Sequence, residues 1–200
     1  KFIAAGACYT GDPWDLVSGT MAEKMTPIGV VLTLPATGSE SNGNAVISRA
    51  STQEKLPMIS PNTFPTFSIL DPKTTFSLPA NQVRNGIVDT FVHVMEQYMH
   101  DYTGAPLMDR FAEGILQTLV EVAPKTLANM EDYESRANFM WCATMALNTL
   151  IASGTTQDWA THMIGHELTA FYGPAHAETL AIVLPGVWRS QLALKGPKLE

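Results

Sequence analysis

Apolar residues in the first third of the chain occur in short runs that are separated by turns containing glycine, serine and proline. The run Ile28–Pro35 (IGVVLTLP) is rich in β-branched residues and is typical of a buried strand. Ala45–Arg49 (AVISR) and Thr66–Asp71 (TFSILD) predict two more strands, and residues 1–20 read as the end of a helix followed by a GDPWD turn. This part of the chain is therefore expected to be of the α/β class.

From Ser77 onward the apolar residues recur at helical spacing. Five segments carry this pattern: 83–99, 110–124, 136–151, 157–171 and 178–188. Pro79 suits the first turn of the first helix, and Pro124 is expected to end the second. We therefore predict a small α/β part over residues 1–76 and an all-helical part over residues 77–200.

Composition and charge narrow the possible partners. The 200 residues are 46% hydrophobic and 16% charged, an ordinary globular balance, and the net charge of −7 disfavours nucleic acid and anionic membrane surfaces. No apolar run is long enough to span a bilayer. The two cysteines lack CxxC spacing, so we expect a cytoplasmic protein. Because the sequence begins within helix-like residues and without Met, it is expected to be part of a longer protein.

A first chemical signal lies in the segment 83–99, where Asp89 and His93 are four residues apart. In a helix this spacing places both side chains on one face, separated by about 6 Å along the axis. The pair could be an ordinary surface contact, but its neighbours are apolar, and a carboxylate buried among them needs a partner. A shared metal ion would be such a partner.

The stretch THMIGHELTAFYGPAH adds His162, His166 and His176, three of the five histidines in the chain. Each one alone could be a hydrogen-bonded core residue, but several imidazoles beside a carboxylate favour a metal site. The spacing does not decide whether His162 binds together with His166 or with the loop residue His176. Glu167 follows the second histidine, so the sequence is not the HExxH of a metalloprotease. The remaining histidine, His100, is expected to be solvated at a helix end.

The loop that follows the first predicted strand, LPATGSESNGN, offers backbone N–H groups and the hydroxyls of Thr33, Thr37 and Ser39. Such groups can bind a phosphate or a ribose. The loop matches neither GxGxxG nor a P-loop, so in isolation it reads as a plain polar turn.

Taken together, these segments resemble the iron-activated (group III) alcohol dehydrogenases, and within them the branch of NADPH-dependent aldehyde reductases and butanol dehydrogenases. TLPATGSES stands where that family has its Thr-Thr-x-Gly-Thr-x-Ser-Glu cofactor loop, with Leu34 and Ala36 as departures. The segments LDPKTTFSLPANQVRNGIVDTFVHVMEQY and DWATHMIGHELTAFYGPAHAETLAIVLP match the parts that carry the metal ligands. The resemblance implies a remnant of a Rossmann-like nucleotide-binding domain followed by a helical metal-binding domain, as in dehydroquinate synthase.

The resemblance also implies roles for individual residues. It gives His166 a catalytic role, as a proton relay or positioning group facing nicotinamide and substrate. Lys55, expected in a polar turn after Arg49, would approach the cofactor phosphates. The implied metal ligands are Asp89, His93, His162 and His176, and the implied cofactor-binding residues are Thr33, Thr37, Gly38, Ser39 and Lys55.

The activity implied is the interconversion of alcohols and aldehydes by hydride transfer with NAD(P)H, running as an aldehyde reductase. Fe(II) is the expected metal, with Zn(II) as the alternative, and NADP(H) is expected in preference to NAD(H). A small aldehyde or alcohol is the expected substrate, and the full-length protein is expected to form a homodimer or a higher homo-oligomer. Two alternatives stay open: an enzyme like glycerol dehydrogenase with the same architecture, and a non-catalytic helical fragment stabilised by metal.

Overall fold

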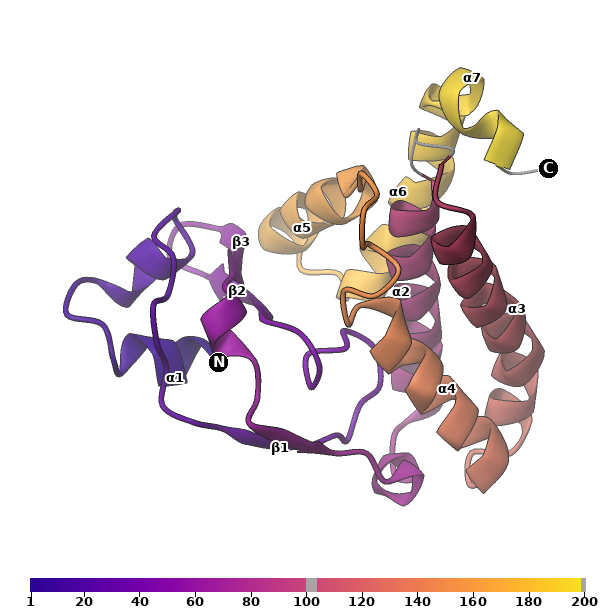
Figure 1. Cartoon of the computed structure of the whole chain (residues 1–200), viewed down its shortest axis with the longest axis horizontal. Coiled ribbons are helices and arrows are strands. Elements are labelled where there is room, and N and C mark those ends of the chain that lie inside the picture. Colours follow the sequence, from indigo (N-terminus) through magenta and orange to yellow (C-terminus); the bar gives the residue numbers. More distant parts are fainter. Residues whose placement is uncertain (100–103, 199–200) are drawn as a thin grey trace.

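The computed structural model describes residues 1–99 and 104–198. Figure 1 shows a part with short strands, in indigo and purple, beside a larger helical part that runs from magenta to yellow. His100 and its neighbour Asp101 lie outside the described residues. The helices and strands follow one another as α1 (Phe2–Gly6), β1 (Gly29–Val31), β2 (Asn44–Arg49), β3 (Glu54–Ile59), β4 (Phe67–Ile69), α2 (Ala80–Tyr98), α3 (Pro106–Ala128), α4 (Tyr133–Ala146), α5 (Ala160–Tyr172), α6 (His176–Ser190) and α7 (Leu192–Lys195).

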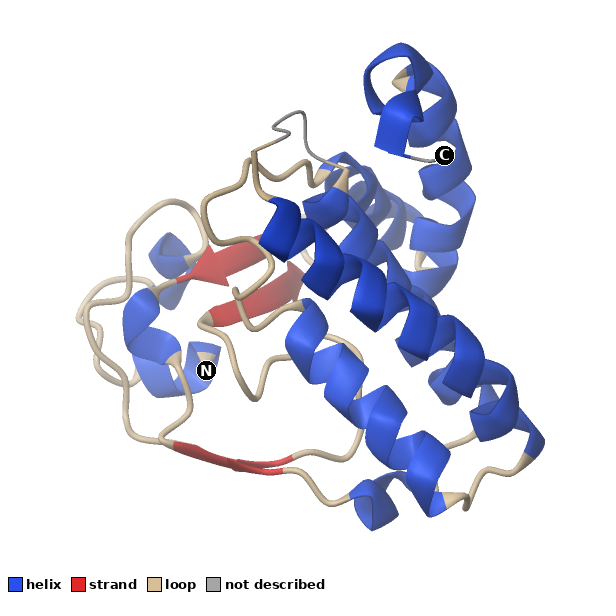
Figure 2. Ribbon diagram, turned by 45° about the vertical axis from the view of Figure 1, so that its right-hand side comes forward, coloured by secondary structure: helices blue, strands red, loops and turns tan. Residues whose placement is uncertain are grey.

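The strands form two small sheets (Figure 2). β1 and β4 pair in parallel, and β2 and β3 form an antiparallel hairpin in which Arg49 is opposite Glu54. The expected buried strand is only three residues long and is not buried, since Val31 is 54% exposed. Within the described part of the chain β4 is the sole hydrogen-bonded neighbour of β1, so this sheet has only two strands.

β3 was not expected from the sequence, and it corrects the position of Lys55. This residue lies on β3, paired with Ser48 of β2, and not in a turn. Pro57 interrupts the β-branched pattern that would have indicated the strand, which tolerates a proline here because the hairpin has an open edge.

The helical part is arranged around α2, which packs against α3, α4, α5 and α6. One core cluster joins Val83 of α2 with Leu119 of α3 and Phe139 of α4, and a second joins Val92 of α2 with Leu180 of α6. All residues from 92 to 97 are buried, so polar side chains in this part of α2 must find partners inside the protein.

Three helix boundaries differ from the expectations. α3 does not end at Pro124 but continues to Ala128, since the exposed proline removes one backbone hydrogen bond and the helix runs on beyond it. His176 is not a loop residue, because it is the first residue of α6. Pro79 lies at the N-cap of α2, one position before the first turn.

The expected fold class is confirmed: a small α/β part precedes a helical part. The division at residue 76 stays a prediction. Cys8 and Cys142 are both free thiols. Among the helices in residues 1–99 and 104–198, none combines the length and the apolar character needed to cross a membrane.

Candidate metal centre

One face of α2 supplies the first part of the site. Asp89, His93 and Glu96 follow one another at intervals of four and three residues, which places them on the same helical face. Each of these three side chains belongs to a residue that is no more than 4% exposed. Burial of so many ionisable groups on one helix face is costly unless they neutralise one another or bind a cation.

The turn between α5 and α6 brings the second part of the site to α2. α5 ends at Tyr172 and is capped by Gly173, whose φ of +81° is a left-handed conformation that glycine adopts at little cost. α6 then begins at His176, and the Glu178 carboxylate accepts a hydrogen bond from the Ala175 N–H at 3.1 Å. His162, near the start of α5, and His176 therefore face Asp89 from two neighbouring helices.

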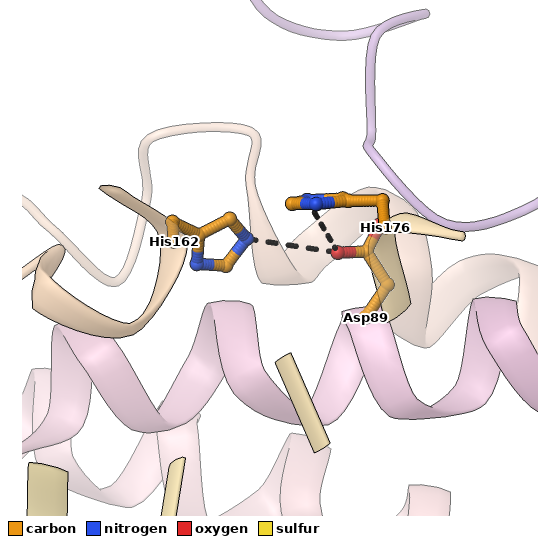
Figure 3. Close-up of side chains that lie close together, drawn as sticks. All are labelled: Asp89, His162 and His176. Carbon is orange, nitrogen blue, oxygen red and sulfur yellow. Dashed lines mark ion pairs between the residues drawn. The ribbon is translucent and has the colours of Figure 1, made fainter. Parts of the chain in front are cut away.

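The three histidines converge on a single carboxylate oxygen. Oδ1 of Asp89 lies 3.7 Å from Nε2 of His93, 3.6 Å from Nε2 of His162 and 3.6 Å from Nε2 of His176. Figure 3 shows two of these contacts, to His162 and His176. In a tetrahedral site with metal–ligand distances of about 2.0–2.1 Å, neighbouring ligand atoms lie roughly 3.4 Å apart. The observed separations are close to that value.

Two buried polar atoms at the centre of the histidine cluster lack hydrogen-bond partners among the described residues, and a cation would fit between them. Asp89 Oδ1 and His162 Nε2 are buried, and neither has a hydrogen-bond partner within residues 1–99 and 104–198. Asp89, His162 and His176 can each direct one ligand atom to a common point, with all of these atoms within 4.8 Å of one another. A carboxylate oxygen with imidazole nitrogens is a donor set that suits Fe(II) or Zn(II).

The electrostatics favour deprotonated ligands at most positions. Burial raises the pKa of Asp89, but its interactions with His93, His162 and His176 outweigh burial and lower this pKa to about 2. Burial lowers the pKa of His93 and that of His176 to about 4 each. His162 differs, because Asp89 and Glu96 overcome the effect of burial and raise its pKa.

His166 lies beside this cluster but does not join it. Its ring centroid is 6.1 Å from that of His162 and 5.0 Å from that of His176. Burial, together with the charge of Lys55, lowers the pKa of His166 to about 3, so its imidazole is neutral at pH 7. Lys55 reaches the same region from β3, which packs against α5.

Glu96 is a residue of the site that the histidine pattern did not indicate. One carboxylate oxygen accepts the Thr161 N–H at 2.5 Å, and the other accepts the His162 N–H at 3.2 Å and contacts Nδ1 of His162. The signal was present in the sequence, since Glu96 lies seven residues after Asp89 and therefore on the same face of the helix.

The expected cofactor loop runs from β1 across α2 to β2. Thr33 and Thr37 are exposed, Ser39 is half-buried, and Gly38 is buried with a φ of +56°. Gly86 of α2 allows the loop to come close, because a Cβ atom there would lie 2.3 Å from the Pro35 carbonyl oxygen.

Asn42 and Lys1 fix the far end of this loop. The Asn42 side-chain amide donates to the carbonyl oxygens of Thr37 and Leu147, at 3.0 and 3.1 Å. The Lys1 ammonium donates to the carbonyl oxygens of Asn42 and Asn44, at 2.7 and 2.9 Å. The loop is thus held at both ends, and within the described residues the hydroxyls of Thr33, Thr37 and Ser39 have no hydrogen-bond partner, whereas Ser41 Oγ donates to the Gly38 carbonyl oxygen.

Two family models match the chain. Residues 1–72 match iron-containing alcohol dehydrogenase, and residues 84–200 match the C-terminal part of the Fe-containing alcohol dehydrogenase family. The NADPH-dependent aldehyde reductase YqhD of Escherichia coli is 54% identical over 203 residues, covering 100% of this chain and 52% of the relative. A probable NADH-dependent butanol dehydrogenase of Bacillus subtilis is 46% identical, covering 96% of this chain and 50% of the relative.

Solved structures agree with these matches. The crystal structure of E. coli YqhD superposes with a TM-score of 0.95 at 54% identity, covering 97% of this chain and 51% of that one. The NADH-dependent butanol dehydrogenase A of Thermotoga maritima gives a TM-score of 0.92 at 40% identity, covering 96% and 48%. The chain thus spans about half the length of these relatives. It belongs to the iron-containing alcohol dehydrogenase family.

Proposed function

We propose that the protein is a metal-dependent oxidoreductase that interconverts alcohols and aldehydes with NAD(P)H and acts as an aldehyde reductase. The observation that carries this proposal is the convergence of three imidazole Nε2 atoms on Oδ1 of Asp89. The family implies a metal ion and a nicotinamide cofactor, and the names of the relatives, aldehyde reductase and butanol dehydrogenase, support the substrate class.

The proposed metal ligands are Asp89, His93, His162 and His176. Fe(II) is the proposed ion, and Zn(II) suits the same donors. When bound, the ion would supply Lewis-acid polarisation of the substrate oxygen. Asp89 and the neutral His93 and His176 need no deprotonation at pH 7 to bind it, since their pKa values lie at about 2, 4 and 4.

His166 is proposed to act on the substrate side of the site. A neutral imidazole carries one N–H donor and one acceptor nitrogen, so it can orient a hydroxyl or carbonyl group and hold a proton. The buried Nδ1 of His166 has no hydrogen-bond partner in the described part of the chain, which leaves the ring available to a ligand. Among the described residues His93, His162 and His176 pair with Asp89 through their Nε2 atoms and His166 does not, which supports a role for His166 other than metal binding.

The cofactor is proposed to lie along the loop after β1. Thr33, Thr37, Gly38 and Ser39 would offer hydroxyl and backbone N–H groups to it, and Lys55 would offer a positive charge to its phosphates. NADP(H) is the proposed form, as the name of the relative with 54% identity contains NADPH, whereas the names of the butanol dehydrogenases contain NADH.

A small aldehyde or alcohol is the proposed partner, in a protein that forms homo-oligomers. The names of the matched relatives favour this substrate class over glycerol. A purely structural metal site is the remaining alternative, and it predicts that ion exchange changes stability without any effect on reduction of a carbonyl group.

The proposal is tested by loading the intact protein with Fe(II) or Zn(II) and following NADPH oxidation with butanal. We expect turnover that is lost on chelation and restored by added metal. The variants His162→Ala and His176→Ala should lose both metal and activity. Activity that is indifferent to chelation and to both substitutions would refute the metal-dependent reaction.

A further inference from the structure

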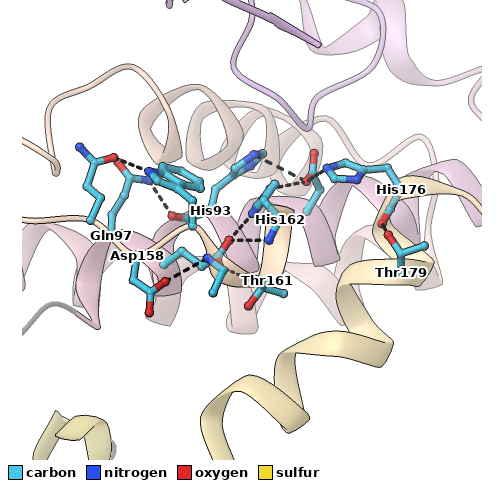
Figure 4. A network of polar contacts seen from close by, with 12 residues as sticks. His93, Gln97, Asp158, Thr161, His162, His176 and Thr179 are labelled. Carbon is cyan, nitrogen blue, oxygen red and sulfur yellow. Dashed lines mark hydrogen bonds and ion pairs between the residues drawn. The ribbon is translucent and has the colours of Figure 1, made fainter. Parts of the chain in front are cut away.

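The carboxylate of Glu96 contacts both the first N–H groups of α5 and the ring of the proposed metal ligand His162. The residue is 4% exposed, and both of its carboxylate oxygens point at the start of α5. One oxygen accepts the Thr161 N–H, and the other accepts the His162 N–H and contacts the His162 ring at Nδ1. Figure 4 shows His162 and Thr161 within this polar network.

Glu96 takes the place of an N-cap residue for α5. The N-cap position is occupied by Trp159, whose side chain makes no cap hydrogen bond in the described structure. The first N–H groups of a helix have no partner within the helix, and they attract negative charge. Two of these groups, those of Thr161 and His162, are satisfied by a side chain from α2 instead. The carboxylate therefore fixes where α5 begins relative to α2.

The same carboxylate determines which nitrogen of His162 carries the proton. An ionised carboxylate accepts hydrogen bonds and donates none, so Nδ1 of His162 must be the protonated nitrogen in the contact with Glu96. In the neutral ring the lone pair then lies on Nε2, the atom that is 3.6 Å from Asp89 Oδ1. This is the nitrogen that faces the proposed metal ion.

We propose that Glu96 is a positioning residue for the metal centre, which sets the tautomer and the orientation of His162. The inference rests on the proposed metal-binding role of His162. Carboxylates that receive the second N–H of a metal-bound histidine raise metal affinity by about 10–100-fold. In this chain the carboxylate also holds the helix end that carries the ligand, so the ring and its backbone are fixed by one group.

The proposal is tested by measuring the Zn²⁺ affinity of the intact protein, by competition with a chromophoric chelator. Glu96→Gln keeps the shape of the side chain but replaces one acceptor oxygen with an NH₂ donor, so we expect a loss of about 10–100-fold. The matched control is Glu40→Gln, because Glu40 is also 4% exposed but its carboxylate accepts a hydrogen bond from Thr144 Oγ1, at 2.6 Å, and not from a histidine. The control should retain the affinity of the wild type.

A double-mutant cycle separates positioning from general stabilisation. If Glu96 acts through His162, then Glu96→Gln should cause no further loss of Zn²⁺ affinity once His162 is replaced by Ala. An equal loss in both backgrounds would overturn the proposal, and so would a Glu96→Gln variant that unfolds more easily without metal but binds Zn²⁺ as the wild type does. Failure of the wild type itself to bind metal would instead refute the proposed function, and with it this role.

A measurement on the wild type tests the proposal even if the variants do not fold. In the zinc-loaded protein labelled with ¹⁵N at histidine, a long-range ¹H–¹⁵N spectrum should show His162 with its proton on Nδ1 and the metal on Nε2. The reverse arrangement, with the metal on Nδ1, would overturn the proposal whatever the variants do.

Discussion

His162 of α5 directs its Nε2 atom at Oδ1 of Asp89 on α2, at a distance of 3.6 Å. His166, one turn further along the same helix, makes no such pair with Asp89 within the described residues, whereas His93 and His176 do. Two identical side chains on neighbouring turns thus have different surroundings, and they should respond differently to the same substitution.

We therefore predict that His162→Asn and His166→Asn affect metal binding differently. His162→Asn should weaken Zn²⁺ or Fe(II) binding by more than about 100-fold, since it removes a ligand and not only a supporting group. His166→Asn should retain the metal and lose turnover with NADPH and butanal. Metal content and steady-state kinetics of the two purified variants check this. Loss of metal from the His166 variant would place that residue among the ligands.

Metal removal should destabilise the protein. Asp89 Oδ1 and His162 Nε2 are buried without hydrogen-bond partners among the described residues, so a cation bound between them would stabilise the folded protein. An ion that binds only the folded state adds about 4.1 kcal/mol to stability at a free concentration 1,000 times its Kd. We expect EDTA to lower the melting temperature of the wild type and to leave that of His162→Asn unchanged. Equal decreases of the melting temperature in the wild type and in His162→Asn would show that EDTA acts at a site other than this metal centre.

The sequence predicted the parts of the site that depend on helical periodicity. The spacing of Asp89 and His93 predicts that they share one helix face, and the structure brings both to His162. Spacing alone could not choose between His166 and His176 as the partner of His162. That choice depends on the turn at Gly173, which brings the start of α6 back to α2, and a turn of this kind is a tertiary feature.

Glu96 and Lys55 show what local patterns leave out. Glu96 lies on the predicted face, but its role depends on the start of α5, which packs against α2 from a distant part of the sequence. Lys55 follows the predicted strand 45–49 in a segment that reads as a polar turn, yet it lies on β3, and the hairpin packs beside α5. The omission of Glu96 thus arises from a contact between distant segments, whereas the error for Lys55 arises within a local hairpin, in which Lys55 pairs with Ser48.

The ion pair between Asp158 and Lys195 should make stability depend on pH. Asp158 Oδ2 lies 2.5 Å from the ammonium of Lys195, whose side chain is 6% exposed. Burial raises the pKa of Asp158, but the hydrogen bonds from Lys195 and from the Ala160 N–H outweigh it and lower this pKa. Since the folded-state pKa lies below that of the unfolded chain, the pair stabilises the fold above about pH 4, and this contribution is lost as the pH falls through the lowered pKa.

Asp158→Asn should therefore reduce the free energy of unfolding by roughly 1.5–3 kcal/mol at pH 7. The difference from the wild type should shrink as the pH falls from 5 toward 3, measured by urea denaturation. Glu121→Gln is the control, because Glu121 and Lys125 form an ion pair whose side chains are 70% and 59% exposed. Loss of this exposed ion pair should not change the midpoint of urea denaturation. If the difference in unfolding free energy between Asp158→Asn and the wild type did not change with pH, the pH dependence could not be assigned to the Asp158–Lys195 pair.

Gly86 provides a test of how the cofactor loop is held against α2. Alanine normally stabilises a helix interior by about 0.5–1 kcal/mol relative to glycine. At position 86, however, the added Cβ would lie 2.3 Å from the Pro35 carbonyl oxygen, and that backbone must move to relieve the overlap. We expect Gly86→Ala to destabilise the protein by about 1–3 kcal/mol and to raise the Kd for NADPH, because Pro35 is two residues from Thr37.

Gly114→Ala is the matched control, since Gly114 is an exposed residue within α3 and a Cβ there would meet no atom within 4 Å in the described structure. It should stabilise the protein by about 0.5–1 kcal/mol and leave NADPH binding unchanged. Denaturation midpoints and NADPH fluorescence titrations of the two variants give the comparison. If Gly86→Ala stabilised the protein as Gly114→Ala does, then the loop would not be held in contact with α2, and its proposed role in presenting Thr37 and Ser39 to the cofactor would lose its structural basis.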